Sequence, residues 1–142
     1  MIIEKQIVVR AAPETIFRIY EDVENWNTWD PDTRAARLDR GLALGSKGYL
    51  SPSKGHSIPI SVTACKANHH FRVTSKTRLF RIDFDHELTP IVSGTRVVHR
   101  VSFGGLMKPV LALMLVPRIN EGLPETLRTL KTRAEREALR KA

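Results

Sequence analysis

The hydrophobic period of the chain changes once, and this change constrains the fold more than any other feature. Over residues 33–103 apolar and polar residues tend to alternate, as they do in strands with one buried face. After Gly104-Gly105 the apolar residues recur at helical spacing. Short connections between neighbouring strands predict an antiparallel sheet. Turn-forming residues divide the alternating part into about six strands, at Gly41, Gly45, residues 52–55, Ala67-Asn68 and residues 90–94.

The segment before these strands is predicted to contain one more strand and two short helices. Residues 1–10 mix charged and apolar residues and are expected to form the first strand of the sheet. Pro13 and Glu14 mark a helix start, because Pro is favoured at the first helical position and an early acid suits the helix dipole. Asn25 is predicted to cap a second short helix that contains both tryptophans and ends at Pro31.

From residue 106 onward the chain is predicted to be a long helix that covers the sheet. A straight helix of about 35 residues would be about 50 Å long, which is longer than is needed to cover a domain of this size. Pro117 and Pro124 are expected to kink or divide it, because a proline inside a helix removes a hydrogen bond. The predicted fold class is α+β, with about seven antiparallel strands and a C-terminal helix in one domain over residues 1–142.

The net charge of the chain is +8, and the excess of cations is greatest near the C-terminus. Residues 128–142 contain six Lys or Arg and two Glu. Such a run could attract nucleic acid, anionic lipid or an acidic protein. Because Glu135 and Glu137 are interspersed and no aromatic residues alternate with the charges, we interpret the run as a solvated helix face and expect no specific nucleic-acid partner.

The cysteine content and the N-terminal segment favour a cytoplasmic protein. The single cysteine, Cys65, cannot form an internal disulfide, so no oxidising compartment is required. The N-terminal segment lacks the uninterrupted apolar core of a signal peptide. The longest apolar run, residues 110–116, is far shorter than the ~20 residues that span a bilayer.

A set of short motifs, in a definite order, gives the chain a family likeness. The motifs are APETIF at 12–17, DVENWNTWDP at 22–31, FDHEL at 84–88, GTRV at 94–97 and GLP at 122–124. Together they cover nearly the whole chain and resemble the polyketide cyclase/dehydrase family of the START-like (SRPBCC) superfamily. The fold of that family, called helix-grip, is related to that of the plant Bet v 1-type allergens.

The resemblance implies a curved sheet that wraps around the last helix and encloses a deep cavity. In this superfamily such cavities hold lipids, sterols, polyketides, quinones or plant hormones. The superfamily includes carriers, receptors, chaperone activators and a few enzymes, so the fold does not imply one chemistry. The family pattern contains no invariant catalytic residues to transfer to this chain.

Two histidines are expected to face the interior of the sheet. His86 has the inward parity of its predicted strand, and His99 has that of the next strand. A hairpin around residues 90–94 brings the two residues opposite or diagonal to each other, with the Cβ atoms roughly 5 to 8 Å apart. Asp83 and Asp85 have the other parity, so we expect them to face solvent instead of orienting either ring.

The two imidazoles have more than one interpretation. In a pocket they could transfer protons near neutral pH, as an aldol cyclisation or a dehydration requires. Alternatively, each ring is a hydrogen-bonded core side chain or binds a ligand carbonyl without chemistry. A metal site with His69 or His70 is a further reading, but no Cys pair, HExxH motif or inward carboxylate completes a zinc site. We expect no metal and no cofactor.

Aromatic and aliphatic side chains are expected to form the rest of the pocket. Trp26, Trp29 and Tyr20 could form an aromatic wall, or they could attach the short helices to the sheet. Of the two tryptophans, Trp29 is expected to be the more buried and Trp26 the one that meets a ligand. The complete set of predicted pocket residues is His86, His99, Tyr20, Trp26, Phe71, Phe84, Val97, Val101 and Met114.

Motifs of other enzyme classes are missing from the sequence. It has no GxSxG motif, no P-loop and no GxGxxG motif. Cys65 alternates with Thr63 on its strand, opposite an apolar set of residues, and we interpret it as a partly covered structural thiol and not as a nucleophile.

These observations leave three functions open. The first is binding, with transport or sequestration, of a small hydrophobic ligand in an internal cavity. The second is a cyclase or dehydratase that uses His86 and His99 as acid and base. The third is transient contact with a membrane surface through the apolar residues 106–116 beside the basic helix, although the same residues could close the core. The ligand and the oligomeric state stay open.

Overall fold

The computed structural model describes residues 2–141, so Met1 and Ala142, the ends of the predicted first strand and of the basic run, lie outside the described residues. Within them the chain forms seven strands and three helices. The helices are α1 (Pro13–Glu21), the 3₁₀ helix η1 (Val23–Thr28) and α2 (Lys108–Lys141). The strands are β1 (Ile2–Val9), β2 (Thr33–Leu38), β3 (Lys47–Pro52), β4 (Ile58–Lys66), β5 (His70–Lys76), β6 (Arg81–Ile91) and β7 (Gly94–Gly104).

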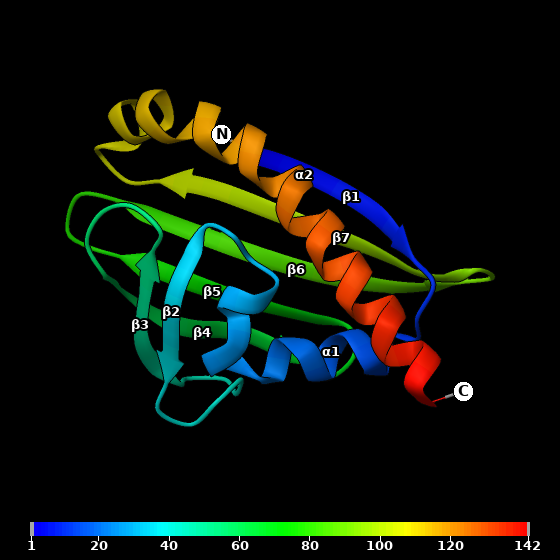
Figure 1. Ribbon diagram of the computed structural model, residues 1–142. Coiled ribbons are helices and arrows are strands. Elements are labelled where there is room, and N and C mark those ends of the chain that lie inside the picture. Colours follow the sequence, from blue (N-terminus) through cyan, green and yellow to red (C-terminus); the bar gives the residue numbers. More distant parts are fainter. Residues whose placement is uncertain (1, 142) are drawn as a thin grey trace.

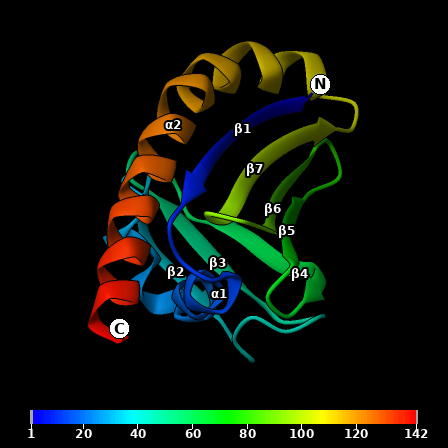
Figure 2. The same ribbon diagram turned by 90° about the vertical axis from the view of Figure 1, so that its right-hand side faces the viewer.

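The seven strands form one antiparallel sheet with the order β1-β7-β6-β5-β4-β3-β2. Strands β2 to β7 each pair with their neighbours along the chain, and β1 pairs with β7. Figure 1 shows α2 crossing one face of the sheet diagonally. Figure 2 shows the sheet curving around that face. The predicted helix-grip architecture, with two short helices between the first two strands, is confirmed.

The two short helices differ in how well they follow their sequence signals. Pro13 opens α1 as predicted, and the helix buries one apolar face. The prediction that Asn25 caps the second helix is wrong, because η1 begins at Val23, whose side chain turns into the core. Asn25 lies inside η1 with φ −110° and ψ 16°, and its side-chain amide donates a hydrogen bond to Asp22 Oδ2 over 2.9 Å.

A β-bulge in β4 changes the direction of Cys65. The register against β5 shifts between Val62 and Ala64, so that Cys65 comes to lie opposite Phe71, a core residue. Its Sγ lies 3.5 Å from the carbonyl oxygen of Leu42 at the edge of the core. The prediction that Cys65 lies opposite the apolar set is wrong, because strict alternation does not continue through a bulge. Burial raises the pKa of Cys65, which agrees with a structural thiol.

Helix α2 is continuous from Lys108 to Lys141, although Pro117 and Pro124 lie inside it. Figure 2 shows that it bends along the curved sheet, so the predicted kink is present without a division of the helix. It begins later than predicted because Gly105, with φ +93°, turns the chain just before it. No helix within residues 2–141 is long and apolar enough to cross a membrane.

Apolar side chains pack against α2 in two clusters. The larger cluster lies under the C-terminal half of the helix, where Leu127 and Leu130 meet the aromatic residues of α1, η1 and β5. The smaller cluster lies under the N-terminal half, where Leu111, Leu115 and Ile119 meet β1, β6 and β7. Both halves of the helix therefore pack against the concave face of the sheet.

Leu130→Ala should destabilise the protein by about 2–5 kcal/mol, because Leu130 is completely buried on the inner face of α2 and its truncation leaves a cavity. Urea unfolding followed by circular dichroism measures this loss. Leu139→Ala is a matched control on the same helix: Leu139 is 77% exposed, so its free energy of unfolding should change by less than about 0.5 kcal/mol. Equal losses in the two variants would contradict the packing of α2 on the sheet.

Candidate functional site

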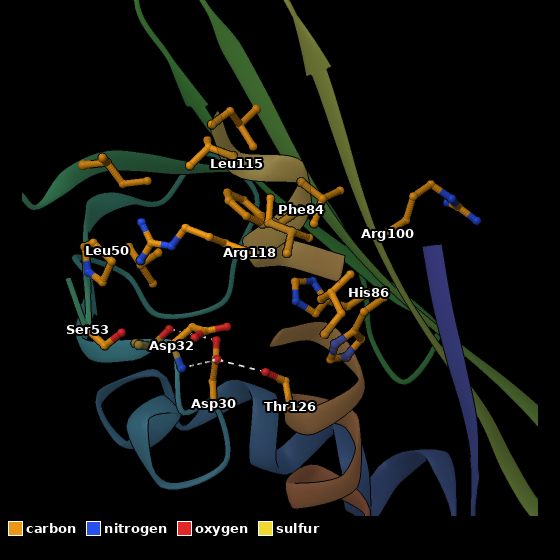
Figure 3. A pocket seen from close by; sticks show the side chains of 18 of the residues that line it. Asp30, Asp32, Leu50, Ser53, Phe84, His86, Arg100, Leu115, Arg118 and Thr126 are labelled. Atoms are coloured by element: carbon orange, nitrogen blue, oxygen red, sulfur yellow. Dashed lines mark hydrogen bonds between the residues drawn. The ribbon is translucent and has the colours of Figure 1, made fainter. Parts of the chain in front are cut away.

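A cavity of about 360 Å³ lies between the concave face of the sheet and the middle of α2 (Figure 3). The inward residues of β3, β4, β6 and β7 form one wall, because alternation along each strand directs every second side chain to this face. The apolar residues of that wall are Leu50, Ile58, Phe80, Ile82, Phe84 and Val101. The cavity is therefore lined mainly by hydrocarbon.

The opposite wall of the cavity is one face of α2. Its apolar residues recur every fourth position, as expected of a helix face, at Leu111, Leu115, Ile119 and Leu123. Met114, which we expected in the pocket, does not line this cavity and is 64% exposed. Successive residues of a helix point about 100° apart, so Met114 and its neighbour Leu115 point in different directions. Only Leu115 reaches the cavity.

His86 and His99 lie directly opposite each other on β6 and β7, one of the two arrangements expected from the hairpin. Their ring centroids are 4.6 Å apart, and both residues line the inner end of the cavity. The ring of His86 stacks on Phe71 with centroids 4.0 Å apart. His99 is 3% exposed, and its Nε2 forms a hydrogen bond of 2.7 Å with the hydroxyl group of Tyr20.

Burial keeps both imidazoles neutral at neutral pH. It lowers the pKa of His99 to about 3. Burial, and then the nearby ring of His99, hold the pKa of His86 well below its usual value. Burial also raises the pKa of Tyr20, so its hydroxyl group stays protonated. The inner end of the cavity can therefore exchange hydrogen bonds, but its imidazoles are weak bases and offer no positive charge to an anion.

Two buried nitrogen atoms on residues of the cavity wall have no hydrogen-bond partner among the described residues. They are Nε1 of Trp29 and Nδ1 of His86. The rings of Trp29 and His86 flank His99, with centroids 6.2 Å and 4.6 Å from its ring. A buried polar group without a partner costs about 1–3 kcal/mol.

Trp29 is the more buried of the two tryptophans, as expected, with 2% exposed against 6% for Trp26, but the prediction that Trp26 meets the pocket is wrong. Trp29 lines the cavity, whereas Trp26 is packed in the core and its Nε1 donates a hydrogen bond of 2.8 Å to the carbonyl oxygen of Tyr20. Tyr20, Phe71 and Val97 are fully buried behind the cavity wall and do not line it. Of the predicted pocket residues, the structure brings four together in the lining: His86, His99, Phe84 and Val101.

The polar mouth of the cavity contains residues that the sequence analysis missed. Arg118 on α2 and Lys54 in the loop after β3 are exposed and contribute cations. Figure 3 shows the Arg118 side chain extending across the cavity toward Leu50. Arg118 lies on the helix face of Leu115 and Leu111, three and seven positions before it, a spacing that would have identified it.

Asp30 is a second residue that the sequence analysis missed, although it follows Trp29 directly. Its Oδ1 accepts hydrogen bonds from Asp32 N (3.0 Å) and Thr126 Oγ1 (3.1 Å), and its Oδ2 accepts one from Thr33 Oγ1 (2.8 Å). Burial raises the pKa of Asp30, although these hydrogen bonds oppose the rise. Asp30 therefore attaches the loop before β2 to α2 at the floor of the mouth (Figure 3).

The side chains of the outward residues of β6 and β7 make their contacts outside the cavity, although Asp85 and Arg100 belong to its lining. His70 Nε2 lies 2.7 Å from Asp85 Oδ1, and this contact leaves only 12% of the Asp85 side chain exposed. The prediction that Asp85 is exposed to solvent is therefore wrong, because its side chain is mostly buried. As expected, Asp85 does not orient the ring of His86 or of His99. Arg100 points away from the cavity and binds Glu4 and Glu87 (Figure 3). Within residues 2–141, no cluster of His, Cys, Asp and Glu could hold a metal ion.

Comparison with solved structures supports the fold. A protein of Mesorhizobium loti, MLL2253, superposes with a TM-score of 0.76 at 16% identity, over 96% of this chain and 98% of that one. A START superfamily protein from Mycobacterium smegmatis superposes with a TM-score of 0.70 at 19% identity, over 95% and 97% of the two chains.

An enzyme-like neighbour has the same fold. The di-domain aromatase/cyclase StfQ of the steffimycin biosynthetic pathway superposes with a TM-score of 0.77 at 13% identity. This chain is covered over 96% of its length and spans 51% of the StfQ chain. At these identities the likeness shows the fold alone.

Sequence comparison identifies the family. None of the proteins with curated descriptions matches this chain. The family model described as polyketide cyclase/dehydrase and lipid transport matches residues 1–135, in agreement with the motifs in the sequence and with the helix-grip fold. The chain belongs to the polyketide cyclase/dehydrase and lipid transport family.

Proposed function

We propose that the protein binds a small hydrophobic molecule in the cavity between the sheet and α2, for transport or sequestration. The observation that carries this proposal is the cavity itself, about 360 Å³ of space between apolar walls on both sides. Ligand sites in proteins have this size and this predominance of hydrophobic lining. The family description, which includes lipid transport, supports the same class of ligand.

The proposed ligand carries at least one oxygen atom at its inner end. The unpartnered nitrogens of Trp29 and His86 supply one donor and one donor or acceptor on residues of the cavity wall. Because both histidines are neutral, an uncharged carbonyl or hydroxyl oxygen fits this end better than a carboxylate does. Lipids, polyketides and quinones with such an oxygen all meet this requirement.

The proposal extends to the domain organisation, the location and the partner of the protein. We treat residues 1–142 as one domain because α2 closes both core clusters. A cytoplasmic location fits the free thiol of Cys65, which requires no oxidising compartment. The proposed partner is the small molecule, and nucleic acid has no part in the proposal.

A cyclase or dehydratase is the second candidate, favoured by the neutral ring of His86 on the cavity wall. That ring could accept a proton from the carbon next to a ligand carbonyl, and a hydroxyl group on the neighbouring carbon would leave with it as water. His99 is bonded to Tyr20 and would complete the acid–base pair. Mass spectrometry of the recovered ligand separates the two candidates, since a carrier returns the ligand unchanged and a dehydratase returns it without one water.

Leu115→Trp should weaken ligand binding at least about tenfold, because the larger side chain occupies the cavity. Fluorescence titration with Nile red, an apolar dye, measures the dissociation constant. Leu113→Trp adds the same ring on the exposed side of the same helix and should leave this constant unchanged. Unchanged binding in Leu115→Trp, with the fold intact by circular dichroism, would place the ligand elsewhere.

Trp29→Phe should reduce the preference of the cavity for oxygen-bearing ligands by about fivefold, because it removes one buried donor worth about 1 kcal/mol. The preference is measured as the ratio of affinities for anthrone, a ketone, and anthracene, a hydrocarbon of similar shape, in displacement of the dye. The same ratio in wild type and variant would contradict a ligand oxygen at this end.

The free energy of unfolding should decrease as the pH falls from 7 to 4. The folded-state pKa of His99 is about 3, below the ~6.5 of an unfolded histidine, so protonation between these values favours the unfolded chain. His99→Gln keeps a partner for the Tyr20 hydroxyl group. This variant should reduce the slope of the unfolding free energy against pH by about 1 kcal/mol per pH unit. Urea unfolding at several pH values measures both slopes, and equal slopes would show that His99 is not buried as a neutral ring.

A further inference from the structure

The first turns of α2 expose an unusual amount of apolar surface. We call this surface the α2 patch and define it by three residues of α2 and two of the turn just before it: Val110, Leu113 and Met114, with Leu106 and Met107. Leu106 is 84% exposed and Leu113 is 81% exposed. Leu79 lies beside the patch, because the backbone N–H of Met107 donates a hydrogen bond of 2.8 Å to its carbonyl oxygen, and it is also exposed. Contiguous apolar surface of this kind marks an interaction site more often than scattered single residues do.

The charges next to the α2 patch along the sequence are all positive, and Asp30 and Asp32 lie farther along, at the cavity mouth. The sequence contains no acidic residue between Glu87 and Glu121, a range that includes the whole patch. Lys108 lies within the patch, Arg78 precedes Leu79, and Arg118 follows Met114 by one helical turn. Among residues 2–141, none of these three cations takes part in a salt bridge. The patch therefore combines apolar side chains with free positive charge.

The α2 patch is continuous with the mouth of the cavity. Val110, Met114 and Arg118 follow one another at intervals of four residues and share one helix face. Arg118 lines the cavity mouth, and the same turns of α2 direct Leu111 and Leu115 into the cavity. A surface that covered the patch would thus lie against the mouth.

We propose that the α2 patch docks on the surface of an anionic phospholipid bilayer, so that the cavity mouth opens toward the lipid. The five apolar side chains enter the interface between head groups and acyl chains, while Lys108, Arg78 and Arg118 contact lipid phosphates and carboxylates. This is the arrangement of an interfacial helix, in which apolar burial and attraction to anionic lipid act together. The part of the proposal that concerns ligand entry rests on the proposed function of the cavity.

A bilayer fits the α2 patch better than a second copy of the chain does. In a two-fold symmetric dimer the same surface meets itself, so the unpaired cations of one copy would lie close to those of the other. Like charges brought together in an interface oppose association. An anionic surface instead neutralises every one of these charges.

The test is co-sedimentation of the full chain with large vesicles of phosphatidylcholine alone or with about one third phosphatidylserine, at low and at moderate salt. We expect at least about tenfold stronger partitioning onto the anionic vesicles at low salt, and a clear loss at moderate salt because salt screens exposed charges. Met114→Glu and Leu113→Glu should each reduce binding at least about tenfold. Leu139→Glu is the matched control, since it places the same charge at an exposed apolar position near the other end of α2 and should retain binding within about threefold.

Three results would overturn the docking proposal. They are equal partitioning of wild type onto neutral and anionic vesicles, a loss in Leu139→Glu as large as in Met114→Glu, and a wild-type dimer in light scattering that Met114→Glu dissociates. Nile red titration distinguishes these failures from failure of the proposed function. A protein that binds the dye but not the vesicles contradicts the docking alone, and one that binds the vesicles but not the dye contradicts the cavity function alone.

Discussion

Helix α2 covers the concave apolar face of the sheet, and the rest of the structure depends on where it makes contact. In its C-terminal half, Leu127 and Leu130 belong to the larger core cluster, together with residues of α1, η1 and β5. Its N-terminal half packs on β1, β6 and β7. The helix bends between these contacts, and the sheet curves with it (Figure 2). The side chains of the two layers enclose a hollow beside both clusters, and that hollow is the candidate site.

The inner end of the cavity differs from its apolar walls because it contains buried polar groups. His86 and His99 have lost their usual basicity through burial, and Tyr20 is tied to His99 by a short hydrogen bond. Protein interiors rarely keep buried polar atoms without partners, since each costs free energy that folding must offset. The nitrogens of Trp29 and His86 are two such atoms, and the proposed ligand oxygen would give them a partner. The proposed ligand binding and the alternative proton transfer both rest on this arrangement.

The N-terminal part of α2 has one face in the cavity and another at the surface of the protein. One face of these turns carries Leu111 and Leu115 into the cavity, and the other exposes Leu113 and Met114. Such a helix is apolar nearly all round, which is unusual for a helix on the surface of a protein in water. The docking proposal places the exposed face against lipid, while the other face lines the cavity.

The local pattern of the sequence determined the strands, the terminal helix and the hairpin that sets His86 opposite His99, because strand period, turn residues and helical spacing act over a few residues. Only the tertiary structure decided which neighbouring side chain faces the cavity. The β-bulge turned Cys65 toward the core, Trp29 instead of Trp26 came to line the cavity, and the rotation of α2 directed Leu115 instead of Met114 into the cavity. Asp30 and Arg118 meet at the cavity mouth from distant parts of the chain. These outcomes depend on how whole elements pack together, and such contacts leave no periodic signal in the sequence.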